Sequence, residues 1–371
     1  MTALTRPARP DSGDTRLRPV PWRRMAGVTW RQHRFALAGA AVLLGALAVW
    51  LWIIGTPLHH AYAAAIACHP ASSAACQDLV GNFNGINDLL AGATTPGGVF
   101  LQLVPVLIGA FAGAPVLARE LETGTFRYAW TQGFGRWRWA LGKLVLLAVV
   151  LAAATGACGV VVSWYYQPYF GSVNQALGLD QISPLVILFS LRGLAFPAWT
   201  VAAFVIGALA GMLIRRVVPA IVATLAVYAG LAVAAAGFLR EHYLTPVTTS
   251  SANVPGTGWI ISQWWTKDGR FAFAGSPPMN LLNQFCSSPP SGQGKPSQGT
   301  FAQCLAQHGY TMWTSYQPAS RFWPLQWIEG GWLLALSALL IAATIWLVRR
   351  RRRRARRRRP GSRRSRGRPG G

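Results

Sequence analysis

The chain has 371 residues, of which 52% are hydrophobic and only 12% are charged. Soluble domains carry about 25% charged residues, so this composition disfavours two ordinary soluble domains and predicts an integral membrane protein. The formal net charge of +25 would suit a nucleic-acid binder, but 14 of the 35 Lys and Arg residues lie between Arg349 and Arg368. The basicity is therefore local, and we expect no specific nucleic-acid partner.

The N-terminal part divides into two segments. Residues 1–20 are rich in Pro, Arg and Asp, and we expect them to be disordered. Residues 21–34 mix Trp22, Met25 and Trp30 with arginines, which favours an amphipathic helix in the membrane interface. An ordinary positively charged flank is the alternative. A cleaved signal peptide fits poorly, because the apolar run that follows is too long.

Six apolar segments are long enough to cross a bilayer. A hydrocarbon core about 30 Å thick requires roughly 20 apolar helical residues. The uncharged segments of that length are residues 35–54, 98–118, 144–162, 193–214, 217–239 and 330–348. We therefore predict an all-α, polytopic membrane protein whose transmembrane domain covers residues 35–348. Prolines in the second and fourth segments, Pro105, Pro115 and Pro197, predict bends or close packing there.

The orientation follows from the Lys and Arg residues in the loops beside the spans. One face would carry 29 of the 35 basic residues, in 1–34, 119–143, 215–216 and the tail 349–371. That face is predicted to be cytoplasmic, with both chain ends on it. We expect the polybasic tail to contact anionic lipid headgroups, worth about 1 kcal/mol per basic residue near the surface. Nucleic-acid binding and docking of a partner are the alternatives for the tail.

The predicted external side carries a large loop, residues 240–329, between the fifth and sixth spans. This loop is long enough to form a small cap, with a flexible section at 287–300. Short apolar runs at 184–190 and 259–265 are too brief to cross, and we expect them at the interface. On this side we expect two disulfides, Cys68–Cys76 and Cys286–Cys304. A metal site at Cys68 and Cys76 with the nearby histidines is the weaker alternative.

One substantial loop, residues 119–143, remains on the predicted cytoplasmic side. Arg119 and Arg127 stand near Glu120 and Glu122, so the acids would be partly neutralised and still available to a basic partner surface. Gly124 allows a turn, and Thr125 can cap a new short helix running towards Gln132. Aromatic residues such as Trp130 suit either a docking protrusion or an anchor in the headgroups. The residues alone leave these two interpretations open.

Three separated stretches carry a resemblance to a known family. They are residues 114–132 (APVLARELETGTFRYAWTQ), residues 191–220 (beginning LRGLAFPAWT) and residues 315–329 (SYQPASRFWPLQWIE). Here the chain resembles the permease subunits of type-2 ATP-binding-cassette (ABC) exporters, in the branch common in actinobacteria. The resemblance implies six helices per permease, two permeases per transporter, as a homo- or heterodimer, and two separate ATPase subunits.

The resemblance also implies that the loop at 119–143 holds the coupling helix that fits a groove on the ATPase. Glu120, Glu122, Gly124 and Thr125 match the acidic, glycine and threonine positions of the family. Trp130, Thr131 and Gln132 match its following turn. Gly133-Phe134-Gly135 departs from the more polar turn expected there, which puts the local docking geometry in doubt. The complete candidate coupling set is Arg119, Glu120, Glu122, Gly124, Thr125, Arg127, Trp130 and Gln132.

The predicted function is therefore export of a hydrophobic or amphipathic substrate, driven by ATP hydrolysed on a partner subunit. The chain itself should be no enzyme and hold no cofactor or metal, since its nearest approach to a phosphate-binding loop, Gly294-Lys295, continues with Pro296. Arg192 and Glu329 are candidates for an outer gate, with solvated interfacial charges as the alternative. Gly207 and Gly211 offer a close-packing face, and the fifth span is our candidate for the dimer axis.

Two rival functions remain. A stand-alone secondary transporter normally carries intramembrane ionisable residues, and the six predicted spans lack Asp, Glu, His and Lys. A membrane sensor or scaffold would use the loop at 240–329 to bind an external ligand. Association with an ATPase separates both rivals from the exporter.

Overall fold

The computed structural model describes residues 22–357, except 71, 124–135, 171–182, 184, 186–188, 251–253, 255–256 and 287–297. The expected disorder of residues 1–20 lies outside the described residues, and so does the tail beyond residue 357.

The described chain is mostly helical, as predicted. Six helical stretches within it are long and apolar enough to cross a membrane: Leu37–Ala67, Leu101–Thr123, Trp137–Tyr165, Ala195–Ile214, Val217–His242 and Ala319–Arg350. They correspond one to one with the six predicted spans. The helices continue beyond the uncharged segments, because hydropathy marks only their apolar middles. Charged residues that we placed in loops, Glu120, Lys143 and Glu329 among them, therefore lie within these helices.

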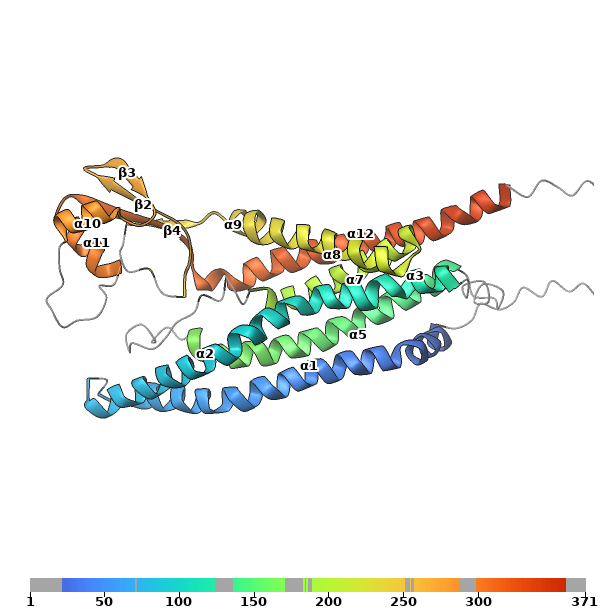
Figure 1. The fold of residues 1–371 in the computed structure, drawn as a ribbon, viewed down its shortest axis with the longest axis horizontal. Coiled ribbons are helices and arrows are strands. Elements are labelled where there is room, and N and C mark those ends of the chain that lie inside the picture. The colour runs from blue at the N-terminus through green and yellow to red at the C-terminus, as the bar shows by residue number, and fades with distance from the viewer. Residues whose placement is uncertain are drawn as a thin grey trace, which may run out of the picture.

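The first two spans are parts of very long helices (Figure 1). Helix α1, Trp22–Ala67, has 46 residues, about 70 Å at 1.5 Å per residue, which is more than twice the bilayer core. Residues 22–34 are its first turns, not a separate helix. Helix α2, Ala74–Ile108, is capped at its N-terminus by Ser73, whose side chain accepts a hydrogen bond from the Cys76 amide. It continues into a π-helical turn, η1 (Gly109–Gly113), and into α3 (Ala114–Thr123).

The other spans surround a central helix. They are α5 (Arg136–Tyr165), α7 (Ala195–Ile214), α8 (Val217–Ala234) continued by η4 (Ala235–Leu239) and α9 (Arg240–His242), and α12 (Phe322–Arg357). Three short 3-10 helices, η2 (Gln167–Phe170), η3 (Phe189–Leu191) and η5 (Ala319–Arg321), stand at their ends. In the apolar stretch of α7, 72% of the residues are buried inside the protein, against 11% in the apolar stretch of α1. Helix α7 is therefore the centre of the bundle, and α1 lies at its edge.

The residues between α9 and α12 form a small β-rich unit, which we call the cap (residues 247–317). Its antiparallel strands are β1 (Val247–Thr249), β2 (Trp259–Lys267), β3 (Arg270–Ala274) and β4 (Tyr310–Gln317), in the order β1-β4-β2-β3. Helices α10 (Met279–Phe285) and α11 (Gln298–Ala306) complete it. The apolar run at 259–265, which we expected at the interface, is part of β2, and Trp265 is buried in the cap core with Leu305.

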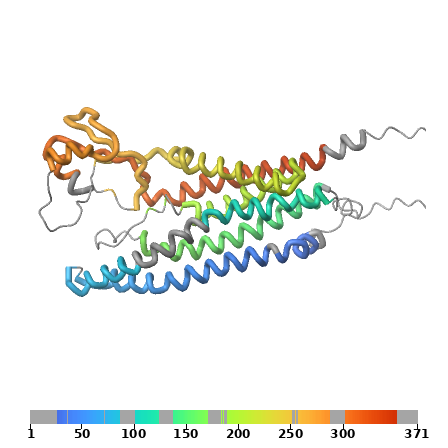
Figure 2. Tube along the Cα trace, in the orientation of Figure 1, coloured from blue at the N-terminus to red at the C-terminus, as the bar shows by residue number. Residues whose placement is uncertain are grey.

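The molecule has two distinct ends (Figures 1 and 2). The cap and the α1–α2 turn lie at one end, which we call the cap end. The start of α1, the end of α3, the start of α5 and the end of α12 lie at the other, which we call the tail end. The described members of both groups of candidate functional residues sit at these ends.

Candidate functional site

At the tail end, a partly buried ion pair closes the base of the candidate coupling loop. Glu120 near the end of α3 accepts a 2.5 Å hydrogen bond from the Lys143 ammonium on α5. The side chain of Lys143 is only 2% exposed, and its Nζ lies 5.4 Å from the centre of the Trp139 ring. We expected Glu120 to be neutralised by neighbouring arginines and free to meet a partner. Instead it holds together the two helices from which the loop departs.

The other described members of the coupling set are not part of this pair. Arg119 and Glu122 are exposed on α3, so they are the two charges that remain available to a partner. His33 of α1 stands near Lys143, and burial first, then the positive charge of Lys143, lower the pKa of His33. Gly124, Thr125, Arg127, Trp130 and Gln132 lie outside the described residues.

At the cap end, a second buried ion pair joins three spans. Glu329 on α12 is fully buried and accepts two 2.8 Å hydrogen bonds from the Arg240 guanidinium at the end of α8–η4–α9. The indole of Trp199 on α7 donates to the same carboxylate at 2.6 Å. Arg240 also donates to the hydroxyl of Ser190 in η3, at 2.6 Å. With its neighbours placed this way, Glu329 cannot be a solvated interfacial charge, which was our alternative for it.

Next to this pair, Gln326 fastens the start of α7. Its side-chain oxygen accepts a hydrogen bond from the Ala195 backbone amide at 2.8 Å. Its side-chain nitrogen donates one to the Phe189 carbonyl at 2.8 Å. Gln326 and Glu329 are three residues apart, so they project from one face of α12. This face contacts the segment around Leu191–Trp199, which means that two of the three resemblance stretches meet in space.

The two proposed gate residues do not form a pair. Arg192 donates to the Ser163 hydroxyl at 3.3 Å, and its guanidinium lies 4.2 Å from the Phe170 ring centre and 4.9 Å from that of Phe322. Burial lowers the pKa of Arg192 to about 10, so it remains charged at neutral pH. The partner of Glu329 is Arg240. The sequence did place one acid, Glu329, and one base, Arg240, near the ends of two spans. Because the two residues are 89 positions apart, the sequence did not show that they pair.

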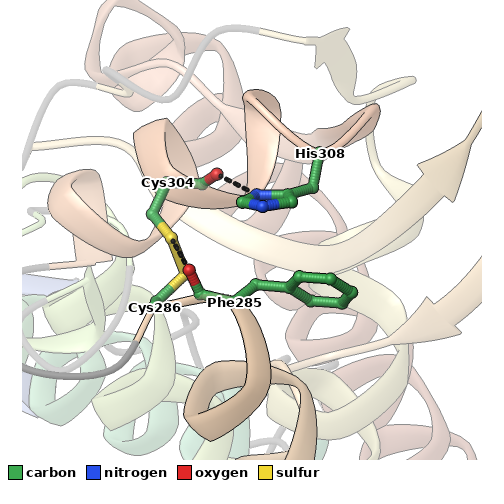
Figure 3. Close-up of a disulfide and its surroundings, with 4 residues drawn as sticks. All are labelled: Phe285, Cys286, Cys304 and His308. Carbon is green, nitrogen blue, oxygen red and sulfur yellow. Dashed lines mark hydrogen bonds between the residues drawn. A yellow bond between two sulfur atoms is a disulfide. The ribbon is translucent and has the colours of Figure 1, made fainter.

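Both cysteine pairs are joined in the structure. Cys68 and Cys76 link the end of α1 to the start of α2, and Cys286 and Cys304 link α10 to α11 in the cap. Figure 3 shows the second bridge, with His308 Nδ1 donating to the Cys304 carbonyl at 3.1 Å and the His308 ring 4.5 Å from that of Phe285. The Cys304 sulfur lies 3.3 Å from the Phe285 carbonyl; because a disulfide sulfur has no proton, this is a contact without a hydrogen bond.

Comparison with known families decides the class. The family described as ABC-2 membrane transporter related matches residues 41–240. This chain belongs to that family. The ABC-2 match covers four whole predicted spans, most of the first, and the loop with the coupling set. No curated protein and no solved structure was found to match the chain.

Family membership fixes a coarse function. An ABC-2 chain is the membrane component of an ABC-type transporter and is not itself the catalytic subunit. Its six apolar helices make it a multi-pass membrane protein. The matched region ends at Arg240, so the cap and the span that carries Glu329 lie beyond it. The ion pair at the cap end therefore joins the ABC-2 region to the rest of the chain.

Proposed function

We propose that this chain is the permease subunit of an ABC exporter whose ATP hydrolysis takes place on a separate subunit docked at residues 119–132. One observation carries the proposal. Helix α3 reaches the tail end with Arg119 and Glu122 exposed, while the Glu120–Lys143 pair holds α3 against α5. A rigid base with outward charges suits a segment that receives force from a partner, since a loosely tethered loop would yield under load.

The tail end faces the cytoplasm in this proposal. The described basic residues at that end include Arg138, Arg215 and Arg349, and the basic segments 1–34 and 349–371 adjoin it. Excess Lys and Arg in loops next to spans marks the cytoplasmic side. The ATPase, which is soluble and needs cytoplasmic ATP, would meet the chain there.

A second permease copy would pack along α8. Only 17% of the residues in the apolar stretch of this span are buried. Its exposed side chains include Val218, Val222, Val227 and Phe238. Gly207 and Gly211 are not available for this contact, because they pack against η1 and α3 within the chain. The fifth span therefore remains our candidate for the dimer axis.

The contacts also suggest how movement would be transmitted. Helix α3 is tied to α5 by the ion pair and continues through η1, which packs closely on α7. Helix α7 in turn is held at the cap end by Gln326 and Glu329 of α12. A tilt of α3 would therefore move α7, and α7 would pull on the bonds at the cap end. ATP binding on the partner would supply this tilt.

The test is co-purification of the chain with its ATPase. We expect Glu122→Lys to weaken ATPase association by about tenfold or more, because it reverses an exposed charge within the docking segment. Gly124→Pro should do the same by fixing φ and removing a backbone donor. The matched control is Asp78→Lys, the same charge reversal at an exposed residue near the cap end, which should leave association unchanged.

If both tail-end variants retain the ATPase as well as the unchanged chain does, docking at 119–132 is wrong. If no ATPase associates with the unchanged chain under any nucleotide condition, the exporter itself is wrong and a sensor or scaffold role replaces it.

A further inference from the structure

A cavity lies beside the ion pair at the cap end. It has a volume of about 370 Å³, and its lining comes from four elements: Gln102 and Pro105 of α2, Ser190 and Leu191 of η3, Trp199 of α7, and Tyr228, Ala232, Ala236 and Arg240 of α8–η4–α9. This volume falls in the range of small-molecule sites, about 300–1,000 Å³. Segments far apart in the sequence thus build one hollow at a level where three spans meet.

The walls combine apolar and polar groups. The rings of Trp199 and Tyr228 stand edge to face with centroids 5.4 Å apart, which gives the cavity an aromatic side. Leu191, Pro105 and Ala232 add apolar surface. Hydrogen-bonding groups are supplied by Gln102, Ser190, Tyr228 and Arg240. Such a wall suits a compound with an apolar body and a polar group.

The electrostatics select against charged ligands. Arg240 is the one charged residue among the described lining residues, and both oxygens of the buried Glu329 carboxylate already accept its hydrogen bonds. An anion would have to compete with Glu329 for that guanidinium. A cation would meet no acidic lining residue and would pay its full desolvation cost. An uncharged ligand escapes both penalties.

The cavity also has an access route. Ala236 is exposed and Ala232 half-buried on α8–η4, so the hollow opens along the side of this span. In a membrane, that side meets either the acyl chains or a second copy of the chain. An amphipathic compound dissolved in the bilayer can therefore reach it without crossing water.

We propose that this cavity is a binding site for small uncharged amphipathic compounds. That these compounds are the transported cargo rests on the proposed exporter function. Binding itself depends only on this chain, so the two ideas are separable. Arg240 and Ser190 would meet the polar group of the ligand, while Trp199 and Tyr228 would contact its apolar body.

The experiment uses two probes with one carbon skeleton. N-phenyl-1-naphthylamine is uncharged, and 8-anilinonaphthalene-1-sulfonate adds a sulfonate to the same rings. Fluorescence titration of the purified full chain in an uncharged detergent should give saturable binding of the neutral probe, at least about tenfold tighter than that of the sulfonate. Equal or tighter binding of the sulfonate overturns the proposal.

A matched pair of variants locates the site. Ala232→Trp fills the cavity and should weaken binding of the neutral probe by about tenfold or more. Ala234→Trp adds the same side chain to an exposed position of the same helix outside the lining, and binding should be unchanged. If Ala232→Trp fails to fold, Ala236→Trp at the mouth replaces it. Unchanged binding in the folded cavity variant overturns the proposal.

Two further measurements separate the outcomes. In phosphatidylcholine vesicles the difference between Ala232→Trp and Ala234→Trp should persist; its disappearance means that a bilayer lipid fills the cavity, which also overturns the proposal. ATPase association is measured apart from probe binding. Loss of probe binding with intact ATPase association rejects the site alone, whereas probe binding without any ATPase rejects the exporter and leaves the site standing.

Discussion

At the scale of single residues, the ion pairs at the two ends of the described chain differ in how fully their carboxylates are hydrogen-bonded. Glu329 at the cap end receives bonds from Arg240 and Trp199 and is fully buried. At the tail end, Glu120 Oε1 meets Lys143, but Glu120 Oε2 is buried without a hydrogen-bond partner. A partly satisfied buried carboxylate is the more easily disturbed of the two. This asymmetry means that the tail-end pair still fixes α3 to α5, but with fewer hydrogen bonds than Glu329 receives at the cap end.

The cap-end pair makes a prediction about charge balance. Arg240→Gln leaves the Glu329 carboxylate buried and unpaired, which should lower stability by about 3–5 kcal/mol. The double variant Arg240→Gln with Glu329→Gln removes both charges and should recover most of that loss. Thermal unfolding of the purified proteins measures both. A double variant that is less stable than Arg240→Gln alone would contradict the charge-balance argument.

At the scale of elements, the bundle centre depends on glycines that let two backbones touch. A Cβ built on Gly207 of α7 would lie 2.2 Å from the Gly109 carbonyl oxygen of η1, and one on Gly211 would lie 2.3 Å from the Ala114 carbonyl oxygen. The π-helical turn η1 brings Gly109 and Gly113 to this contact. The Gly207–Gly211 spacing was visible in the sequence, but which helix it would meet was not. It serves the packing of α7 inside one chain.

This contact predicts an unusual sensitivity to a single methyl group. Gly207→Ala should lower the stability of the chain by about 1–3 kcal/mol, because the added carbon forces α7 away from η1. Gly230→Ala on α8 is the matched control, since a Cβ there has no neighbour within 4 Å. By helix propensity that change should be neutral or stabilising by up to about 1 kcal/mol. Thermal unfolding that ranks the two variants the other way contradicts the packing.

At the scale of the whole molecule, the six spans were predictable because each has an uncharged stretch long enough for the bilayer. Their true ends were not, because Glu120, Lys143 and Glu329 satisfy their charges inside the bundle with partners distant in sequence. The same limit hid Arg240 as the partner of Glu329. The sheet of the cap was missed as well, because its central pairing, β2 with β4, joins residues about fifty apart in the sequence. The β2–β3 hairpin is local, and its Asp268-Gly269 turn was a sequence signal that we did not use.

The orientation of the molecule gives the last prediction. Both ends of the described chain reach the tail end, so one accessible residue at each end suffices to orient all six spans. Asp268 in the cap and Glu122 on α3 are exposed. Asp268→Cys should react with a membrane-impermeant maleimide in intact cells, and Glu122→Cys only after the membrane is opened.

The unchanged chain supplies the background for this labelling, which should be low because four of its cysteines are paired and Cys158 is buried. Labelling of Glu122→Cys in intact cells would place the coupling segment outside, where no ATP-hydrolysing partner can reach it. The excess of basic residues at the tail end argues for the opposite result, since each of those charges would otherwise have to be translocated across the membrane. The same labelling therefore tests the orientation and the side on which an ATPase can dock.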